Sequence, residues 1–108
     1  MRSTSEDKQE VTERHAWVYM VECRDGSLYT GWTYDVEARV AKHNGGKGAK
    51  YTRSRRPVTL RWREAQPSRS AAMKREAAIK KLKPPQKRRL ILDFAEGRRT
   101  EREASHRF

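Results

Sequence analysis

Residues 16–33 read AWVYMVECRDGSLYTGWT, two segments rich in aromatic and β-branched residues on either side of a short polar stretch. Such segments favour β-strands. Between them stands Arg24-Asp25-Gly26, a strong turn signal because glycine readily adopts positive φ. The stretch therefore predicts a β-hairpin with strands over 16–23 and 27–33.

The turn allows two strand registers with different consequences. A two-residue turn sets Tyr19 opposite Trp32, and it places Tyr19 and Tyr29 on opposite faces of the hairpin. A three-residue loop with Gly26 in the left-handed conformation sets Tyr19 opposite Gly31, and both tyrosines then share a face. The residues of the hairpin alone permit either register.

Further elements follow along the chain. Asp35 or Thr33 is suited to cap a helix that runs to about residue 44, where Gly45-Gly46 ends it. Residues 47–57 form a basic loop, and 58–65 (VTLRWREA) alternate apolar and polar residues as a half-buried strand does. A helix is expected over 69–83, a break at Pro84-Pro85, and a further helix over 86–96 whose Leu90, Ile91 and Phe94 dock on the core.

The order β-β-α-β-α-α predicts an α+β domain, with a small antiparallel or mixed sheet covered by helices. A chain of 108 residues has room for one domain, which we place at 16–96. Residues 1–15 and 97–108 are polar, and we expect them to be an N-terminal tail and a charged C-terminal tail or frayed helix. The single cysteine, Cys23, is expected to be a buried strand residue.

No segment is apolar enough for a membrane span or a signal peptide, which predicts a cytoplasmic protein. The formal net charge of +12 predicts a polyanionic partner, most often nucleic acid. Residues 42–56 contain six basic residues and no acidic one. We expect these to contact nucleic acid: Lys42, Lys47, Lys50, Arg53, Arg55 and Arg56.

Polar residues occupy positions where a core is expected. Val36, Arg39, Val40 and His43 follow the spacing of one helix face. A buried arginine needs an anionic partner from the protein or a ligand, unless its stem packs on the sheet and its head reaches water.

The helix over 69–83 has the same feature. Its stripe of Ala72, Ile79 and Leu82 also contains Glu76, for which a surface ion pair with Lys80 one turn later is the alternative.

Taken together, these side chains suit the hydrolysis of a phosphodiester. Arg39 would neutralise charge that develops on a phosphate. Glu76 would hold one Mg²⁺ or Mn²⁺ ion, with waters and substrate oxygens as the other ligands. A tyrosine hydroxyl would orient or deprotonate water, but its ordinary pKa of about 10 calls for help from His43, Arg39 or the metal.

These residues resemble the GIY-YIG nuclease family. The two signature triplets appear as Val18-Tyr19-Met20 and Tyr29-Thr30-Gly31. The family's helix arginine matches Arg39, its metal-binding glutamate matches Glu76, and residues 46–52 (GKGAKYT) are similar to a loop of small stand-alone members. The resemblance covers about residues 16–92.

The resemblance implies a three-stranded antiparallel sheet flanked by helices, and metal-dependent cleavage of nucleic acid. In the family Tyr19 and Tyr29 would activate or position water and phosphate, Arg39 would bind the scissile phosphate, and His43 would assist a tyrosine. This favours the register in which both tyrosines share a face. Gly31 opposite Tyr19 would then leave room for a phosphate against the sheet.

The function expected from the sequence is therefore a monomeric, Mg²⁺-dependent endonuclease acting on structured or damaged DNA, in repair or recombination. The alternative is a module on the same fold that binds nucleic acid without cutting it. A small ribosome-associated protein would explain the charge but leaves the inward-facing Arg39 and Glu76 unexplained.

Overall fold

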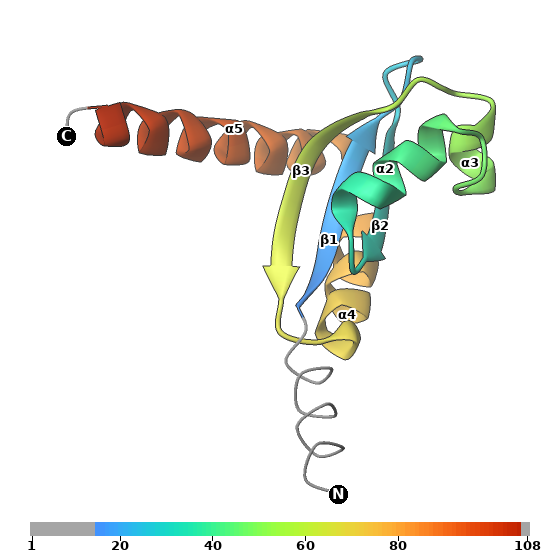
Figure 1. The fold of residues 1–108 in the computed structure, drawn as a ribbon, viewed down its shortest axis with the longest axis horizontal. Helices are drawn as coiled ribbons and strands as arrows, with labels where there is room; N and C mark the ends of the chain where they lie inside the picture. The colour runs from blue at the N-terminus through green and yellow to red at the C-terminus, as the bar shows by residue number, and fades with distance from the viewer. Residues whose placement is uncertain (1–14, 107–108) are drawn as a thin grey trace, which may run out of the picture.

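Three strands form an antiparallel sheet in the order β2-β1-β3, with the first strand in the centre (Figure 1). The computed structural model describes residues 15–106, with side chains as far as residue 97. The strands are β1 (Ala16–Glu22), β2 (Leu28–Thr33) and β3 (Thr59–Gln66). With the helices that flank this sheet, the structure confirms the predicted α+β class and its three antiparallel strands.

The hairpin adopts the three-residue loop. Tyr19 pairs with Gly31, and Val21 pairs with Tyr29, so the two tyrosines lie on the same face. A hydrogen bond of 2.8 Å from the amide of Cys23 to the carbonyl of Ser27 closes the loop. Gly26 has φ +87°, in the left-handed region that favours glycine. The register that the family resemblance favoured is thereby confirmed.

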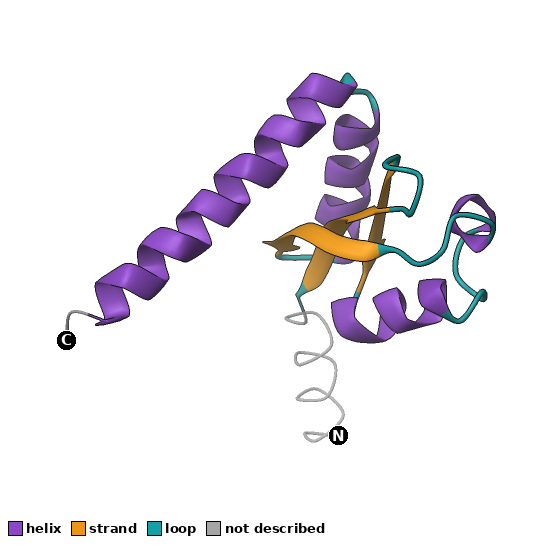
Figure 2. Ribbon diagram, turned by 90° about the horizontal axis from the view of Figure 1, so that it is seen from above, coloured by secondary structure: helices purple, strands orange, loops and turns teal. Residues whose placement is uncertain are grey.

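Helices cover both faces of the sheet (Figure 2). On one face lie α2 (Val36–Asn44) and the single turn α3 (Lys50–Arg53). On the other face lie α4 (Arg69–Lys80) and the beginning of α5 (Pro84–His106), the rest of which extends away from the sheet. The sheet therefore separates two cores with different contents.

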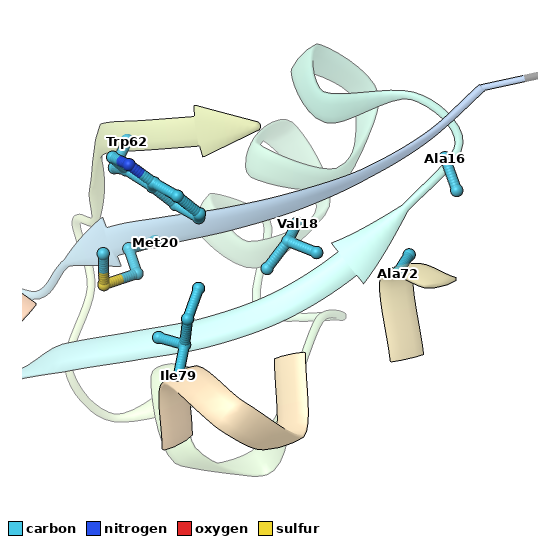
Figure 3. Packing of buried hydrophobic residues seen from close by; sticks show 6 residues of the cluster. All are labelled: Ala16, Val18, Met20, Trp62, Ala72 and Ile79. Carbon is cyan, nitrogen blue, oxygen red and sulfur yellow. The ribbon is translucent and has the colours of Figure 1, made fainter. Parts of the chain in front are cut away.

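The core on the α4 face is apolar. Trp62, Ile79 and the alternate residues of β1 pack together there, as Figure 3 shows. Leu90, Ile91 and Phe94 of α5 pack against this cluster, as the spacing of the sequence predicted. Its buried members are Ala16, Val18, Met20, Trp62, Ala72 and Ile79.

A β-bulge divides the apolar residues of β3 between the two faces. Met20 pairs with Trp62, but the next residue of β1, Val21, pairs with Leu60. The bulge reverses the facing of the strand, so Trp62 packs on the α4 side while Leu60 packs on the α2 side. The unbroken alternation expected over 58–65 is wrong at this point.

The ends of α2 follow the predicted signals. The side chain of Asp35 accepts a hydrogen bond of 3.1 Å from the amide of Ala38, as an N-cap does. At the other end Gly45 is the C-cap, and Gly46 turns the chain with φ +81°. These caps fix where Arg39 and His43 lie on the helix.

The bounds of the two C-terminal helices differ from those expected. The helix expected over 69–83 ends at Lys80, and the next one begins already at Pro84, because proline fits the first turn of a helix. Residues 97–106, where a charged tail or frayed helix was expected, continue α5, since the sequence after Gly97 (RRTEREA) is rich in helix formers. Most of the predicted N-terminal tail, residues 1–14, lies outside the described residues. No helix in the described part of the chain is long and apolar enough to cross a membrane.

Candidate active site

The core on the α2 face contains polar side chains. Tyr19, Val21, Cys23, Val36 and Val58 are buried in it, and Tyr29 packs against them. Cys23 is buried as expected, but it lies one residue beyond the end of β1 and not within the strand. The imidazole of His43 enters the same region and has no exposed surface. A buried polar ring requires hydrogen-bond partners, which identify the centre of the site.

Tyr19, His43 and Thr52 form a buried hydrogen-bonded chain. Tyr19 Oη lies 2.8 Å from His43 Nε2, and His43 Nδ1 lies 2.8 Å from Thr52 Oγ1. Thr52 Oγ1 in turn lies 3.0 Å from the carbonyl oxygen of Ala49. At the other end, Arg39 Nε donates to Tyr19 Oη over 3.4 Å. The chain joins β1, α2 and α3 through side chains far apart in sequence.

The directions of these hydrogen bonds follow from what each group can accept. The Ala49 carbonyl only accepts, so the Thr52 hydroxyl donates to it and accepts from Nδ1–H of His43. His43 Nε2 is then unprotonated and accepts the hydroxyl proton of Tyr19.

The opposite tautomer leaves the buried hydroxyl proton of Tyr19 without an acceptor among the described residues, which is costly. It would gain a contact from the Ala49 amide to Nδ1, but that contact is long, at 3.4 Å. We therefore assign the tautomer with the proton on Nδ1.

Burial and charge shift the two titrating groups of this chain. Burial raises the pKa of Tyr19 above 10.0; the hydrogen bond and charge of Arg39 oppose this, and the nearby Tyr29 and Glu76 add to it. Burial, and then the positive charge of Arg39, lower the pKa of His43 below 6.5. In neutral solution Tyr19 is therefore a phenol and His43 an uncharged imidazole able to receive its proton.

Arg39 is the cation of the site. Its side chain is half-buried, and Tyr19 is its only hydrogen-bond partner among the described residues. None of the described carboxylates forms an ion pair with it. An arginine placed in this way retains donors for an incoming anion.

Gly31 has a different role from the one predicted. A Cβ at this position would lie 2.6 Å from Tyr19 Oη and 2.8 Å from Tyr19 Cζ. The space beside the glycine is therefore filled by the ring of Tyr19 and is not left open for a phosphate. Gly48 acts similarly in the loop over 46–52, because a Cβ there would collide with the ring of His43.

Tyr29 is the more accessible of the two tyrosines. Its ring meets His43 edge to face, with centroids 5.3 Å apart, and stacks on Tyr51 at 5.9 Å. The ammonium group of Lys80, from α4, lies 5.9 Å from the centre of the Tyr29 ring. Tyr29 thus lies between the α2 face and the helix that carries Glu76.

Glu76 reaches the site from α4. Its side chain is 20% exposed, and Oε2 lies 3.4 Å from Lys80 Nζ, which is the ion pair that its spacing allowed. Its charge still acts on Tyr19. No cluster of three or more His, Cys, Asp or Glu suited to a metal occurs within the described residues. A lone carboxylate completed by waters and phosphate oxygens is the type of site that Mg²⁺ accepts, so Glu76 fits that role.

The basic residues predicted to contact nucleic acid are not equivalent. The side chains of Lys42, Lys47, Lys50 and Arg53 are exposed. Arg55 is neutralised by Asp25 at 3.2 Å and lies 4.0 Å over the ring of Tyr51.

Arg56 also has a structural role in the loop, because it donates to the carbonyls of Arg53 and Asn44. Charge is therefore available to an outside anion at some positions of the loop and not at others.

Sequence reasoning missed Thr52 and Tyr51. Thr52 is fully buried and completes the chain that begins at Tyr19. Both residues lie in a basic loop without apolar periodicity, and only the fold brings them to His43 and Tyr29. Their sequence signal is limited to the GKGAKYT segment, which resembles a loop of the family.

Comparison with known proteins agrees with this arrangement. The family described as the GIY-YIG catalytic domain matches residues 15–89. A UPF0213 protein of Streptococcus sanguinis is 61% identical over 69 residues, which are 64% of this chain and 79% of its own. A UPF0213 protein of Halobacterium salinarum is 59% identical over 74 residues, or 68% of this chain and 96% of its own.

A solved structure shows the same fold. The solution NMR structure of protein EF2693 from E. faecalis is 44% identical with a TM-score of 0.53, over 75% of this chain and 86% of that one. The protein therefore belongs to the GIY-YIG catalytic domain family, as the resemblance of its motifs predicted, and is similar to the UPF0213 proteins.

Proposed function

We propose that this chain is a divalent-metal-dependent endonuclease that hydrolyses phosphodiester bonds in structured or damaged DNA, in repair or recombination. The observation that carries the proposal is the setting of Arg39. Arg39 is half-buried, donates a hydrogen bond to Tyr19 and forms no ion pair with a described carboxylate. An arginine with only a packing role would be expected to pair with a carboxylate of the protein, or its position would be expected to hold an apolar residue.

Each side chain has a role in this proposal. Arg39 binds the scissile phosphate and stabilises the charge that develops on it. When its guanidinium turns to the phosphate, the hydroxyl of Tyr19 is uncovered for a water molecule. Tyr19 then accepts a proton from water as it passes its own to His43 Nε2, so His43 is the final base. Tyr29 orients the water or the phosphate from the more accessible side.

Glu76 would hold the metal ion. A bound Mg²⁺ or Mn²⁺ would act as a Lewis acid toward the phosphate and the leaving oxygen. Lys80 Nζ lies 3.4 Å from Glu76 Oε2, so Lys80 would compete with the metal ion for this carboxylate.

The test is cleavage of branched, single-stranded and duplex DNA with Mg²⁺ or Mn²⁺. Arg39→Ala and Glu76→Ala are each expected to lower the rate at least about 100-fold. Matched controls are Arg89→Ala and Glu37→Ala, which remove side chains that form exposed ion pairs elsewhere. Cleavage that survives both site variants would refute the assigned site. Binding without cleavage of any substrate would favour the alternative, a nucleic-acid-binding module on this fold.

A further inference from the structure

The described arginines divide into two groups by their partners. One group forms ion pairs with carboxylates of the protein, with Arg61 and Arg88 sharing Glu22: Arg55, Arg61, Arg63, Arg75, Arg88 and Arg89. The other group has no carboxylate partner within residues 15–97: Arg24, Arg39, Arg53, Arg56 and Arg69. Arg39 lies in the candidate active site, where we assign its charge to the scissile phosphate.

Three of the remaining arginines line one hollow. Arg24 comes from the hairpin loop, Arg53 from the end of α3, and Arg56 from the segment before β3. The hollow has a volume of about 410 Å³ and is completed by Asn44, Ser54 and Pro57. None of these lining residues is acidic. Three guanidinium groups around one space repel each other unless an anion is present.

One of the three guanidinium groups, that of Arg56, is held in place by the protein. Arg56 Nε donates to the carbonyl of Arg53 over 2.9 Å, and Nη1 donates to the carbonyl of Asn44 over 3.3 Å. The backbone makes room for this guanidinium at Gly46, where a Cβ would lie 2.9 Å from Nη1.

The wall beside Arg56 is also fixed. The amide of Val58 donates to Asn44 Oδ1 over 2.7 Å, and Asn44 Nδ2 donates to the Val58 carbonyl over 3.1 Å. The orientation of Arg56 is therefore set before any ligand arrives, which lowers the ordering cost of binding.

The hollow lies next to the candidate active site along the chain. His43 and Thr52 point inward to the buried chain, whereas their immediate neighbours Asn44 and Arg53 line the hollow. Arg55, although between Arg53 and Arg56 in sequence, is paired with Asp25 and belongs to the first group.

We propose that this hollow binds a phosphate group of the nucleic-acid backbone at a distance from the bond that is cut. Planar guanidinium groups match phosphate oxygens well, and phosphate contacts position a nucleic acid without reading its sequence. The inference rests on the proposed function only for the choice of nucleic acid as ligand. It adds Arg24 to the predicted binding residues and removes Arg55 from them.

The test measures binding without metal, so that no cleavage is required. The affinity of a short fluorescein-labelled DNA duplex is followed by anisotropy over a series of salt concentrations. Arg24→Ala and Arg53→Ala are each expected to weaken binding about fivefold or more and to reduce the salt slope by up to about one unit. The control is Arg61→Ala, an exposed arginine that pairs with Glu22 and lies outside the hollow, which is expected to change both quantities little. Arg56 is left intact because it holds the loop together.

Two outcomes would overturn the proposal. One is an affinity and salt slope in Arg24→Ala and Arg53→Ala equal to those of the Arg61→Ala control. The other is an NMR titration in which inorganic phosphate binds the hollow of the wild type but not that of Arg53→Ala, while Arg53→Ala leaves DNA binding unchanged. Such a hollow binds a small anion and not the nucleic-acid backbone. Thermal melts of each variant verify folding. Because binding is read without metal, failure here is distinct from a loss of cleavage in Arg39→Ala.

Discussion

Tyr19 Oη and His43 Nε2 lie 2.8 Å apart where solvent does not reach either residue. The ring of His43 supports the phenol from within the protein, while Arg39 covers the phenol on its other side. A phenol that donates to a neutral imidazole can lose its proton without the proton leaving the protein. This pair links the polar core of the α2 face to the proposed chemistry.

Replacing Tyr19 with phenylalanine removes the hydroxyl and keeps the ring. We expect cleavage to fall by about 10²–10⁴-fold, the usual range for loss of a proton-transfer group. Single-turnover rates at saturating metal measure the change. The matched control is Tyr34→Phe, because Tyr34 is an exposed tyrosine outside the chain of hydrogen bonds. A rate in Tyr19→Phe equal to that of the control would remove Tyr19 from the mechanism.

Thr52 acts by positioning His43. Thr52→Val loses the acceptor for Nδ1–H, whereas Thr52→Ser keeps it. We expect the valine variant to lose the Nδ1-protonated form in ¹⁵N NMR spectra of the imidazole and to cleave at least about tenfold more slowly. The serine variant is expected to restore both readouts. An unchanged tautomer in Thr52→Val would show that another group fixes the ring.

A side chain at position 31 would collide with the ring of Tyr19. Gly31→Ala sets a methyl group against the ring of the fully buried Tyr19, and the unfolding free energy is expected to fall by about 1–3 kcal/mol. Gly45→Ala is the control, because its φ of −82° suits any residue and its nearest neighbour would lie 3.4 Å from the new Cβ. Urea denaturation of both variants makes the comparison. Equal stabilities would mean that the Tyr19 ring moves freely, contrary to its burial.

The lowered pKa of His43 makes stability depend on pH. Since the folded-state pKa lies below 6.5, the unfolded chain takes up a proton at a higher pH than the folded chain does. The stability contributed by neutral His43 is present above pH 6.5 and is lost as the pH falls through the folded-state pKa. The unfolding free energy should therefore decrease between about pH 7.5 and 5.5. His43→Gln should show a smaller decrease, and parallel curves for the two proteins would contradict the assignment.

Lys80 and a metal ion compete for Glu76. Glu76→Gln is expected to abolish Mg²⁺ binding measured by calorimetry, whereas Lys80→Met is expected to strengthen it about twofold, the scale of an i,i+4 ion pair. Lys81→Met is the control for the loss of one nearby positive charge, since Lys81 forms no described ion pair with Glu76. Weaker Mg²⁺ binding in Lys80→Met than in the control would mean that the lysine supports the metal site.

Much of this arrangement could be predicted from local patterns. The strands, the caps of α2 at Asp35 and Gly45, and the inward placement of Arg39 and His43 follow from turn chemistry and periodicity. The hairpin register did not follow, because two- and three-residue loops suit the same three residues. Family resemblance, not local physics, favoured the register that the structure has.

Other features depend on contacts between distant segments. The bulge beside Trp62 is set by pairing with β1, which the alternation of β3 does not reveal. Thr52 acquires its role only because α3 folds back on α2. Helix α5 passes beyond Gly97 because the following residues favour a helix more strongly than one glycine opposes it. The role of Gly31 was mistaken because the sequence shows that space is needed there but not which group fills it.

The polar chain from Arg39 to Thr52 serves the proposed chemistry at a cost in the stability of the domain. Leucine at position 43 and valine at position 52 would turn the α2 face into an ordinary apolar core, and replacement of buried polar groups by well-packed apolar ones often stabilises a domain. Selection for heat resistance alone would therefore favour loss of the chain. Its presence in so small a domain, where stability is scarce, is what a role other than stability would predict.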